Sequence, residues 1–389
     1  MSERVQARQR RVIHRAVAAG VVIAWACTVS DGGEAPGGAV RAEVLGSVAR
    51  RAVGPSFGEF AAVAAQLRDA TAAHASAAAS GAADVDATRE AAQQAWRDAM
   101  VAWQVVEVMQ LGPAGSSFAA VGGEDLRDEI YSWPTVNTCR IDQELLLGEY
   151  ASDTFTQTRL ASTYGLDALE YLLFFEGADN TCAPQLPINA DGQWAALGEA
   201  ELLARRAAYG AAVADEVATL AERLAATWAP DTGEYAQWLA APGEAGSPYD
   251  DVDAALDEVL RAMFYVDTLL KDAKIAFPAG IAGCTTDTCP EGLESPWAQR
   301  SKEHVLSNLE GYRRMFVGGA SAQEGVGFDD LLIEVGEDAL ATRMLADIDA
   351  AVAAVEAVDG TFAEALAADG AALDGVYAAI ERLTDALED

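Results

Sequence analysis

Histidine and positive charge are both scarce in this chain of 389 residues. It has 3 histidines, and its 26 lysines and arginines face 61 aspartates and glutamates, a net charge of −35. So few histidines nearly exclude a multi-histidine metal site, and the acidity argues against nucleic acid as a partner because phosphates would be repelled. The chain also lacks a glycine-rich nucleotide loop, a P-loop and a G-x-S-x-G motif. With 51% hydrophobic residues it can still bury a sizeable core.

The N-terminus has the layout of an export signal. Five arginines precede a short apolar run at residues 16–26, whereas a membrane-spanning helix needs about 20 apolar residues. We therefore predict a signal peptide over residues 1–26. Small residues followed by Cys27 resemble a bacterial lipobox, which predicts lipidation of Cys27. The alternative is simple cleavage, in which this cysteine is either removed or left unmodified. Residues 27–47, which begin rich in glycine, are predicted to be a flexible tether.

Four further cysteines remain in the predicted mature chain. An even number in an exported protein favours two disulfides. Cys284 and Cys289 are close enough in sequence to close a loop on each other, which leaves Cys139 to pair with Cys182. The alternative is a zinc site made from all four, although no C-x2-C pair is present.

The apolar period is helical almost throughout, because alanine, leucine, glutamate and arginine dominate and alternating β-branched runs are scarce. The fold class is therefore predicted to be all-α. Predicted helices cover residues 56–80, 86–111, 124–131, 140–150, 155–175, 194–228, 250–273, 298–316, 328–336, 338–357, 360–367 and 370–388. The proline- and glycine-containing stretch 177–193 is predicted to be a loop and a candidate domain boundary.

Two helical segments place carboxylates on apolar faces. Trp96, Trp103 and Glu107 share one helical stripe. Asp167 and Glu170, three residues apart, share another. Because a buried carboxylate is costly unless a cation or donors satisfy it, both patterns are compatible with a metal or a basic partner. The alternatives are a solvated helix end for Glu107 and the acidic edge of an amphipathic helix for the pair.

The segment 131–143 looks like a shaped turn with its own hydrogen bonds. It contains Trp133, Arg140 and Asp142 around a Trp-Pro break. Its simpler interpretation is loop chemistry beside a disulfide anchor. The two histidines of the mature chain, His74 and His304, have no ligand-like neighbours in sequence and are interpreted as surface or satisfied residues, and no catalytic residue is assigned.

Several segments together resemble the imelysin family, also called peptidase family M75, from about residue 50 to the C-terminus. The Trp96 to Glu107 stripe comes first and the turn at Trp133 with Arg140 and Asp142 follows. Gly165 then opens the segment that carries Asp167 and Glu170. The last marks are Lys271, Lys274 and an Asn-Leu-Glu-Gly segment at residues 308–311.

The resemblance implies an all-α fold of two helical-bundle domains, expected here at residues 48–190 and 194–389. It also implies an exported, often lipid-anchored protein linked to iron uptake, with some members called metallopeptidases. The family's signature is Gly-x-His-x-x-Glu, a proposed metal site between the domains. Gly165 and Glu170 match that signature, but Asp167 stands where the histidine would be.

An oxygen-only donor set favours a hard cation such as an iron, manganese, calcium or magnesium ion over zinc. Glu107, Asp142 and Asp267 are the candidate further ligands, and Arg140 would orient a carboxylate. We therefore expect a periplasmic or cell-surface lipoprotein that binds a metal ion or an iron-containing ligand, with other envelope proteins as possible partners and the lipid as its only membrane contact. The alternatives are a surface interaction module without metal, and a metallopeptidase that uses Glu170 as ligand or base.

Overall fold

The computed structural model describes residues 37–152 and 154–388. The predicted export signal, the predicted lipidation at Cys27 and residues 27–36 of the predicted tether lie outside these ranges. Every regular element of the described residues is helical and no strand occurs among them, which confirms the all-α class. None of the described helices combines the length and the apolar character that crossing a membrane requires.

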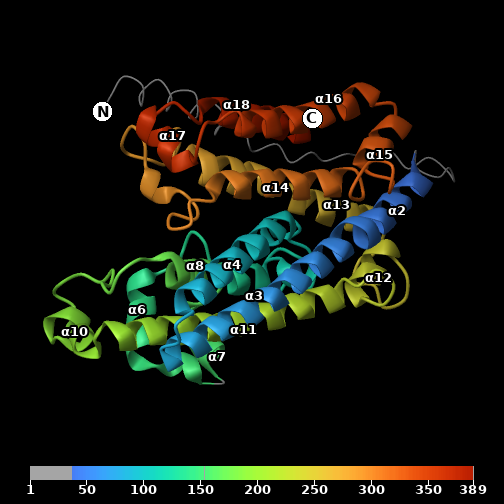
Figure 1. Ribbon diagram of the computed structural model, residues 1–389. Helices are drawn as coiled ribbons and strands as arrows, with labels where there is room; N and C mark the ends of the chain where they lie inside the picture. Colours follow the sequence, from blue (N-terminus) through green and yellow to red (C-terminus); the bar gives the residue numbers. More distant parts are fainter. Residues whose placement is uncertain (1–36, 153, 389) are drawn as a thin grey trace.

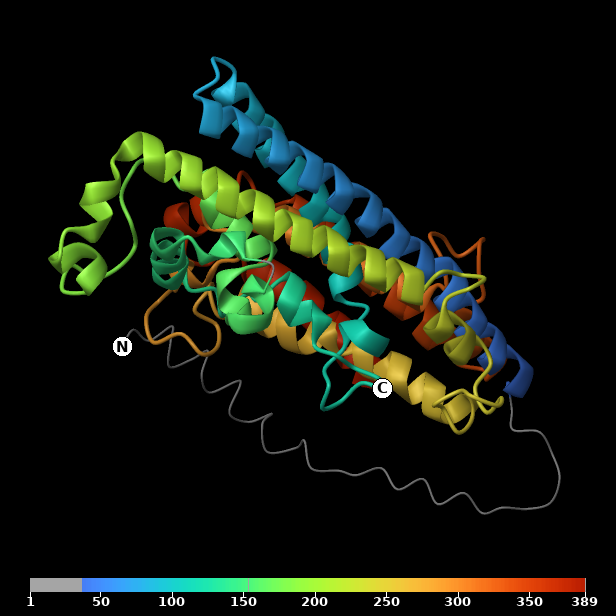
Figure 2. The same ribbon diagram turned by 90° about the horizontal axis from the view of Figure 1, so that it is seen from below.

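The helices form two layers (Figure 1). The lower layer in that view is built around two long helices that pack against each other along their length, as Figure 2 also shows. Its main elements are α3 (Gly54–Ser80), α4 (Val85–Glu107), α8 (Leu166–Phe174), α11 (Glu199–Thr227) and α12 (Glu234–Ala240). The long pair is α3 and α11, and α4 packs on α3.

The upper layer holds the C-terminal helices. They are α13 (Val252–Met263), η5 (Val266–Ala276), α14 (Ser301–Phe316), α15 (Phe328–Glu334), α16 (Asp338–Glu356), α17 (Phe362–Ala368) and α18 (Asp374–Glu388). Where one helix was expected over 250–273, the chain forms α13 and then a π-helical stretch, η5. Helix α14 packs on α4 and thereby joins the two layers.

Short elements connect these helices. They are η2 (Gly112–Ala114), α5 (Leu126–Ile130), α6 (Thr138–Leu147), η3 (Glu149–Ala151), α7 (Phe155–Thr158), η4 (Ala161–Thr163), α9 (Pro187–Ala190), α10 (Gln193–Leu197) and η6 (Pro290–Gly292). One of them, α5, supplies a side chain to the candidate site described below.

Part of the predicted tether is instead helical. Residues 38–47 form α2 (Gly38–Ser47), which continues through the π-helical η1 (Val48–Val53) into α3. Val44 and Leu45 are fully buried, and α2 packs against α12, α13 and α15. The tether prediction is therefore wrong for this stretch, because tertiary packing of its few apolar side chains fixes a helix that its own sequence signals weakly.

The predicted helix over 155–175 is also wrong as one element. It divides into α7, η4 and α8, and Gly165 lies at the last break with φ +93°. A Cβ atom at this position would lie 2.8 Å from the carbonyl oxygen of Ile130. Because only glycine tolerates both that φ and that close approach, Gly165 ends one segment and starts α8 at a fixed place.

The boundary expected at residues 177–193 does not separate the two layers. Helix α11 follows this stretch, yet it packs against α3 and α8 of the N-terminal part. The change from the lower to the upper layer comes later, between α12 and α13. The division of the chain into two bundle domains remains a prediction.

Both predicted disulfides are present. Cys139 and Cys182 join α6 to the loop after α8, and Cys284 and Cys289 close a short loop after η5. The four cysteines therefore form two pairs rather than a zinc site. The first bridge closes a loop with a sequence separation of 43, a length that stabilises a fold by about 3–4 kcal/mol in the chain-entropy model.

The packing of α2 predicts a large effect of one truncation. Leu45→Ala would lower the free energy of unfolding by about 2–5 kcal/mol, because it leaves a cavity at a fully buried position. Glu43→Ala, at an exposed position of the same helix, is the control and is expected to change it by about 0.5 kcal/mol or less. Chemical denaturation measures both. Equal, negligible effects would mean that residues 38–47 are a tether after all.

Candidate functional site

A buried lysine lies where the two layers meet. Lys274 extends from η5 and is 1% exposed. Its Nζ donates to Glu107 Oε2 at 2.8 Å, to Gln104 Oε1 at 2.5 Å and to Asn308 Oδ1 at 2.9 Å. It also lies 3.0 Å from Glu294 Oε1. One ammonium group thus connects α4, α14, η5 and the irregular segment before α14.

Glu107 and Glu294 are the carboxylates that this lysine compensates. Glu107 also pairs with Arg127 of α5, at 2.6 Å from Nη2 to Oε1. Burial alone would raise the pKa of Glu107, but Lys274 and Arg127 lower it to below its usual value. The pKa of Glu294 is likewise lowered, against the effect of burial, by Lys274 and by His304, whose Nδ1 lies 3.3 Å from Glu294 Oε2. Both carboxylates are therefore held ionised.

Asp167 and Glu170 lie on α8 and have a different environment. Asp167 Oδ2 accepts a hydrogen bond from Ser132 Oγ at 2.6 Å, and Oδ1 accepts one from the backbone N–H of Ala168. Among the described residues Asp167 forms no ion pair. Burial raises the pKa of Asp167 to about 6, although the bond from Ser132 opposes the rise.

Glu170 is more strongly affected than Asp167. Its Oε1 accepts hydrogen bonds from Ser295 Oγ at 2.9 Å and from the backbone N–H groups of Trp297 and Ala298 at 3.0 and 2.7 Å. No cationic side chain of the described residues pairs with it. Burial, and secondarily the charge of Glu294, raise the pKa of Glu170 to about 8 in spite of those three donors. At neutral pH Glu170 is therefore mostly protonated.

Tyr131 connects the two kinds of carboxylate. Its hydroxyl donates to Glu294 Oε1 at 2.7 Å. Burial and then the charges of four carboxylates, at positions 294, 107, 167 and 170, raise the pKa of Tyr131 well above its usual value. These four carboxylates therefore share one buried region around the tyrosine. We name the seven residues involved the central cluster: Glu107, Arg127, Tyr131, Asp167, Glu170, Lys274 and Glu294.

The structure brings three of the five predicted metal ligands into the central cluster: Glu107, Asp167 and Glu170. It does not bring Asp142 or Asp267 there. Asp142 accepts hydrogen bonds from Tyr171 Oη at 2.9 Å and from the backbone N–H of Thr181 at 2.8 Å, near the first disulfide. Asp267 pairs with Lys271, one turn along η5. Both carboxylates belong to local networks of their own.

The three residues expected to shape the site have distinct places. The Trp133 ring faces Lys274, with its centroid 5.7 Å from Nζ. Gly165 starts α8, as described above. Arg140 pairs with Glu144, at 2.5 Å from Nη2 to Oε1, and so does not orient a carboxylate of the central cluster. Of these three, only Trp133 contacts a charged group of the cluster.

Sequence reasoning missed three members of the central cluster: Arg127, Tyr131 and Glu294. Lys274 was noted only as a mark of resemblance. Lysine is the residue type that proteins bury least often, and Glu294 lies in an irregular segment without apolar periodicity, so neither carried a sequence signal. His304, interpreted from the sequence as a surface or satisfied residue, is not at the surface: it is buried between Glu294 and the Trp96 ring.

The number and type of donor atoms in the central cluster determine whether it could hold a metal ion. Within residues 37–152 and 154–388, no three His, Cys, Asp or Glu side chains are grouped so that they could hold a metal ion. Asp167 and Glu170, flanked by the hydroxyls of Ser132 and Ser295, offer oxygen only. Oxygen donors are of the type that a hard cation prefers, but these are fewer than the ligands that complete such a site.

The central cluster predicts that Lys274 is the residue whose loss costs most stability. Lys274→Met keeps the length of the side chain but leaves Glu107 and Glu294 short of positive charge, so it would lower the free energy of unfolding at neutral pH by about 3–5 kcal/mol. Lys271→Met, on the same element and paired with the partly exposed Asp267, would lower it by about 1 kcal/mol or less. Urea unfolding of both variants checks this. A neutral Lys274→Met would show that the ion cluster does not hold the layers together.

Comparison with known proteins identifies the family. Residues 55–389 match the Imelysin (peptidase M75) family. A solved protein from Parabacteroides distasonis, described as an iron-regulated protein A precursor, has 17% identity and a TM-score of 0.69, over 93% of this chain and 95% of that one. An imelysin-like protein from Psychrobacter arcticum has 16% identity and a TM-score of 0.65, over 90% and 94%. A search of curated proteins gives no significant match. The two structures share the fold of this chain, and the family match covers most of its length. This chain therefore belongs to the imelysin family.

Proposed function

We propose that this protein is an exported, lipid-anchored member of the bacterial cell envelope that takes part in iron or metal uptake by binding a hard cation at Asp167 and Glu170. The predicted signal and Cys27 support export and anchoring. The iron-regulated description of one solved structure with the same fold supports the link to iron. The central cluster supports the site.

One observation carries the proposal: the central cluster buries more carboxylates than cationic side chains. Lys274 and Arg127 compensate Glu107 and Glu294. Asp167 and Glu170 have no such partner in the described part of the chain, and burial raises the pKa of both, to about 6 and about 8. Protons therefore supply the missing positive charge, and a cation that displaced them would have the same electrostatic effect.

The donor set decides which cation fits. Zinc sites in proteins use nitrogen and sulfur ligands together with carboxylates, and within residues 37–152 and 154–388 no histidine or cysteine is grouped with this pair. Hard cations of the magnesium type are held by one or two carboxylates and keep several waters. Asp167 and Glu170 would hold such an ion, with water and neighbouring hydroxyls as the remaining donors. The bound ion would supply positive charge in place of the proton that Glu170 carries at neutral pH.

Proton displacement gives the proposal a distinctive pH dependence. Below the folded-state pKa of about 8, each cation must remove the proton of Glu170. Affinity should therefore rise by about tenfold per pH unit between pH 6 and 8, and level off above that. Calorimetric titration of the protein with iron(II), manganese, magnesium, calcium and zinc ions at several pH values measures this.

Isosteric variants locate the site. Asp167→Asn/Glu170→Gln removes both ionisable groups with little change of volume and should abolish the saturable binding. Asp329→Asn is the matched control, because burial also raises the pKa of Asp329, which lies on α15 outside the cluster. Weak binding that does not discriminate among cations and is the same in the double variant would contradict the proposal and favour a surface interaction module.

A further inference from the structure

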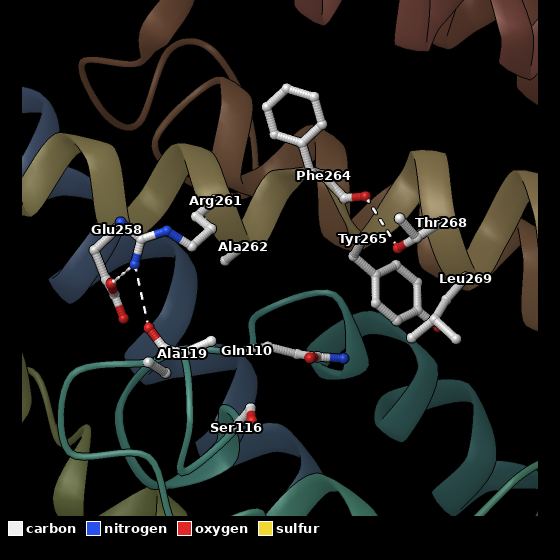
Figure 3. A pocket seen from close by; sticks show the side chains of 11 residues that line it. Gln110, Ser116, Ala119, Glu258, Arg261, Ala262, Phe264, Tyr265, Thr268 and Leu269 are labelled. Carbon is white, nitrogen blue, oxygen red and sulfur yellow. Dashed lines mark hydrogen bonds and ion pairs between the residues drawn. The ribbon is translucent and has the colours of Figure 1, made fainter. Parts of the chain in front are cut away.

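Asp167 and Glu170 are each 2% exposed, so a cation can reach them only if a covering element moves. A pocket of about 230 Å³ opens between the loop that follows α4 and the junction of α13 with η5 (Figure 3). Neither carboxylate lines this pocket, so it gives no direct access to them. The element that moves must therefore lie among those that contact the pair.

Residues 295–299, which we name the strap, form a thin cover over Glu170. On the inner side, Ser295 Oγ and the backbone N–H groups of Trp297 and Ala298 all donate to Glu170 Oε1. The remaining two residues of the strap are exposed. A single thickness of chain thus separates Glu170 from solvent on this side, whereas elsewhere α8 packs against the long helices α4 and α11.

Contacts at both ends hold the strap in place. Before it, Glu294 is buried, and its Oε1 lies 3.0 Å from Lys274 Nζ. After it, Ser301 begins α14, and its Oγ donates to the carbonyl oxygen of Glu294. The backbone N–H of Gln299 also donates to the carbonyl oxygen of Ser295 at 2.8 Å, which closes the strap on itself. A short segment held in this way moves by backbone rotation at its end residues.

Both end residues of the strap have a backbone conformation that residues other than glycine avoid. Ser295 and Gln299 each have φ +55°. Among the described residues, Asp125 is the one other non-glycine residue with a positive φ. Ser295 also precedes Pro296, and a proline pushes the residue before it towards extended conformations. Strained residues of this kind persist only while surrounding contacts hold them, and they are typical of switch regions and ligand clamps.

We propose that the strap is the gate through which a cation reaches Asp167 and Glu170, an inference that rests on the function proposed above. When the strap opens, its end residues leave the left-handed region and its three donors leave Glu170 Oε1, so that relief of backbone strain offsets part of the lost hydrogen bonding. When it closes, the same donors hold the carboxylate again. Gln299 sets how often the gate opens, because its side chain is exposed and a substitution there acts mainly on the backbone preference.

Hydrogen exchange on the full-length, cation-free protein tests the opening. The amides of Trp297 and Ala298 are expected to exchange faster than that of Leu169 inside α8, which bonds the carbonyl oxygen one turn earlier and reports unfolding of the bundle. Gln299→Val should speed up exchange in the strap about tenfold, because a β-branched residue tolerates φ +55° least. Gln299→Gly should slow it about threefold, because glycine adopts this φ without strain. Asp125→Gly, at the third such position, is the control and should leave the strap amides unchanged.

Manganese ions test the route. In stopped-flow mixing, followed by quenching of tryptophan fluorescence, Gln299→Val should raise the association rate and Gln299→Gly should lower it by the same factors. The Kd should stay unchanged, because the strap is closed in both the free and the bound protein. Equal association rates in the two variants, or strap amides that exchange only with the bundle, would overturn the gate. No manganese binding to any form would instead contradict the proposed function, and the exchange rates alone would then decide whether the strap opens.

Discussion

The burial of charge at the junction of the two layers is the constraint on which the rest of the structure depends. Four carboxylates of the central cluster lie around Tyr131, and the cationic side chains of Lys274 and Arg127 compensate two of them, Glu107 and Glu294, with His304 also beside Glu294. Ionised carboxylates cannot be buried without compensation. The remaining pair, Asp167 and Glu170, accepts hydrogen bonds from Ser132, Ser295 and backbone N–H groups, and burial raises the pKa of both carboxyl groups.

The same cluster explains how the layers are joined. Lys274 comes from η5 of the upper layer, and Glu107 comes from α4 of the lower one. Asn308 of α14 bonds both Lys274 and the backbone of α4, where its Nδ2 donates to the carbonyl oxygen of Gln104 at 2.7 Å. Because a buried ion pair is costly when either partner is lost, displacing one layer would expose unpaired charge. The residues of the central cluster therefore both join the two layers and form the candidate binding site.

The sequence was sufficient where a local pattern decides the structure. Helical periodicity predicted most of the long helices, and cysteine spacing predicted both disulfides. The stripe that ends at Glu107 and the spacing of Asp167 and Glu170 left burial and solvation open, and the structure buries all three carboxylates. The sequence was insufficient where tertiary contacts determine the structure. Burial of Leu45 orders α2, and the close approach of Ile130 to Gly165 divides a predicted helix. The partners of Glu107 come from distant segments, so no local pattern could have assigned them.

The central claim is that protons balance the excess buried carboxylate, and infrared spectroscopy tests it most directly. A difference spectrum between the protein and its Glu170→Gln variant isolates the carboxyl group of Glu170. The account predicts a protonated-carboxyl band at pH 7 that disappears as the pH rises through about 8, and that also disappears when a bound cation displaces the proton. A carboxylate signal at pH 7 without such a band would contradict the account.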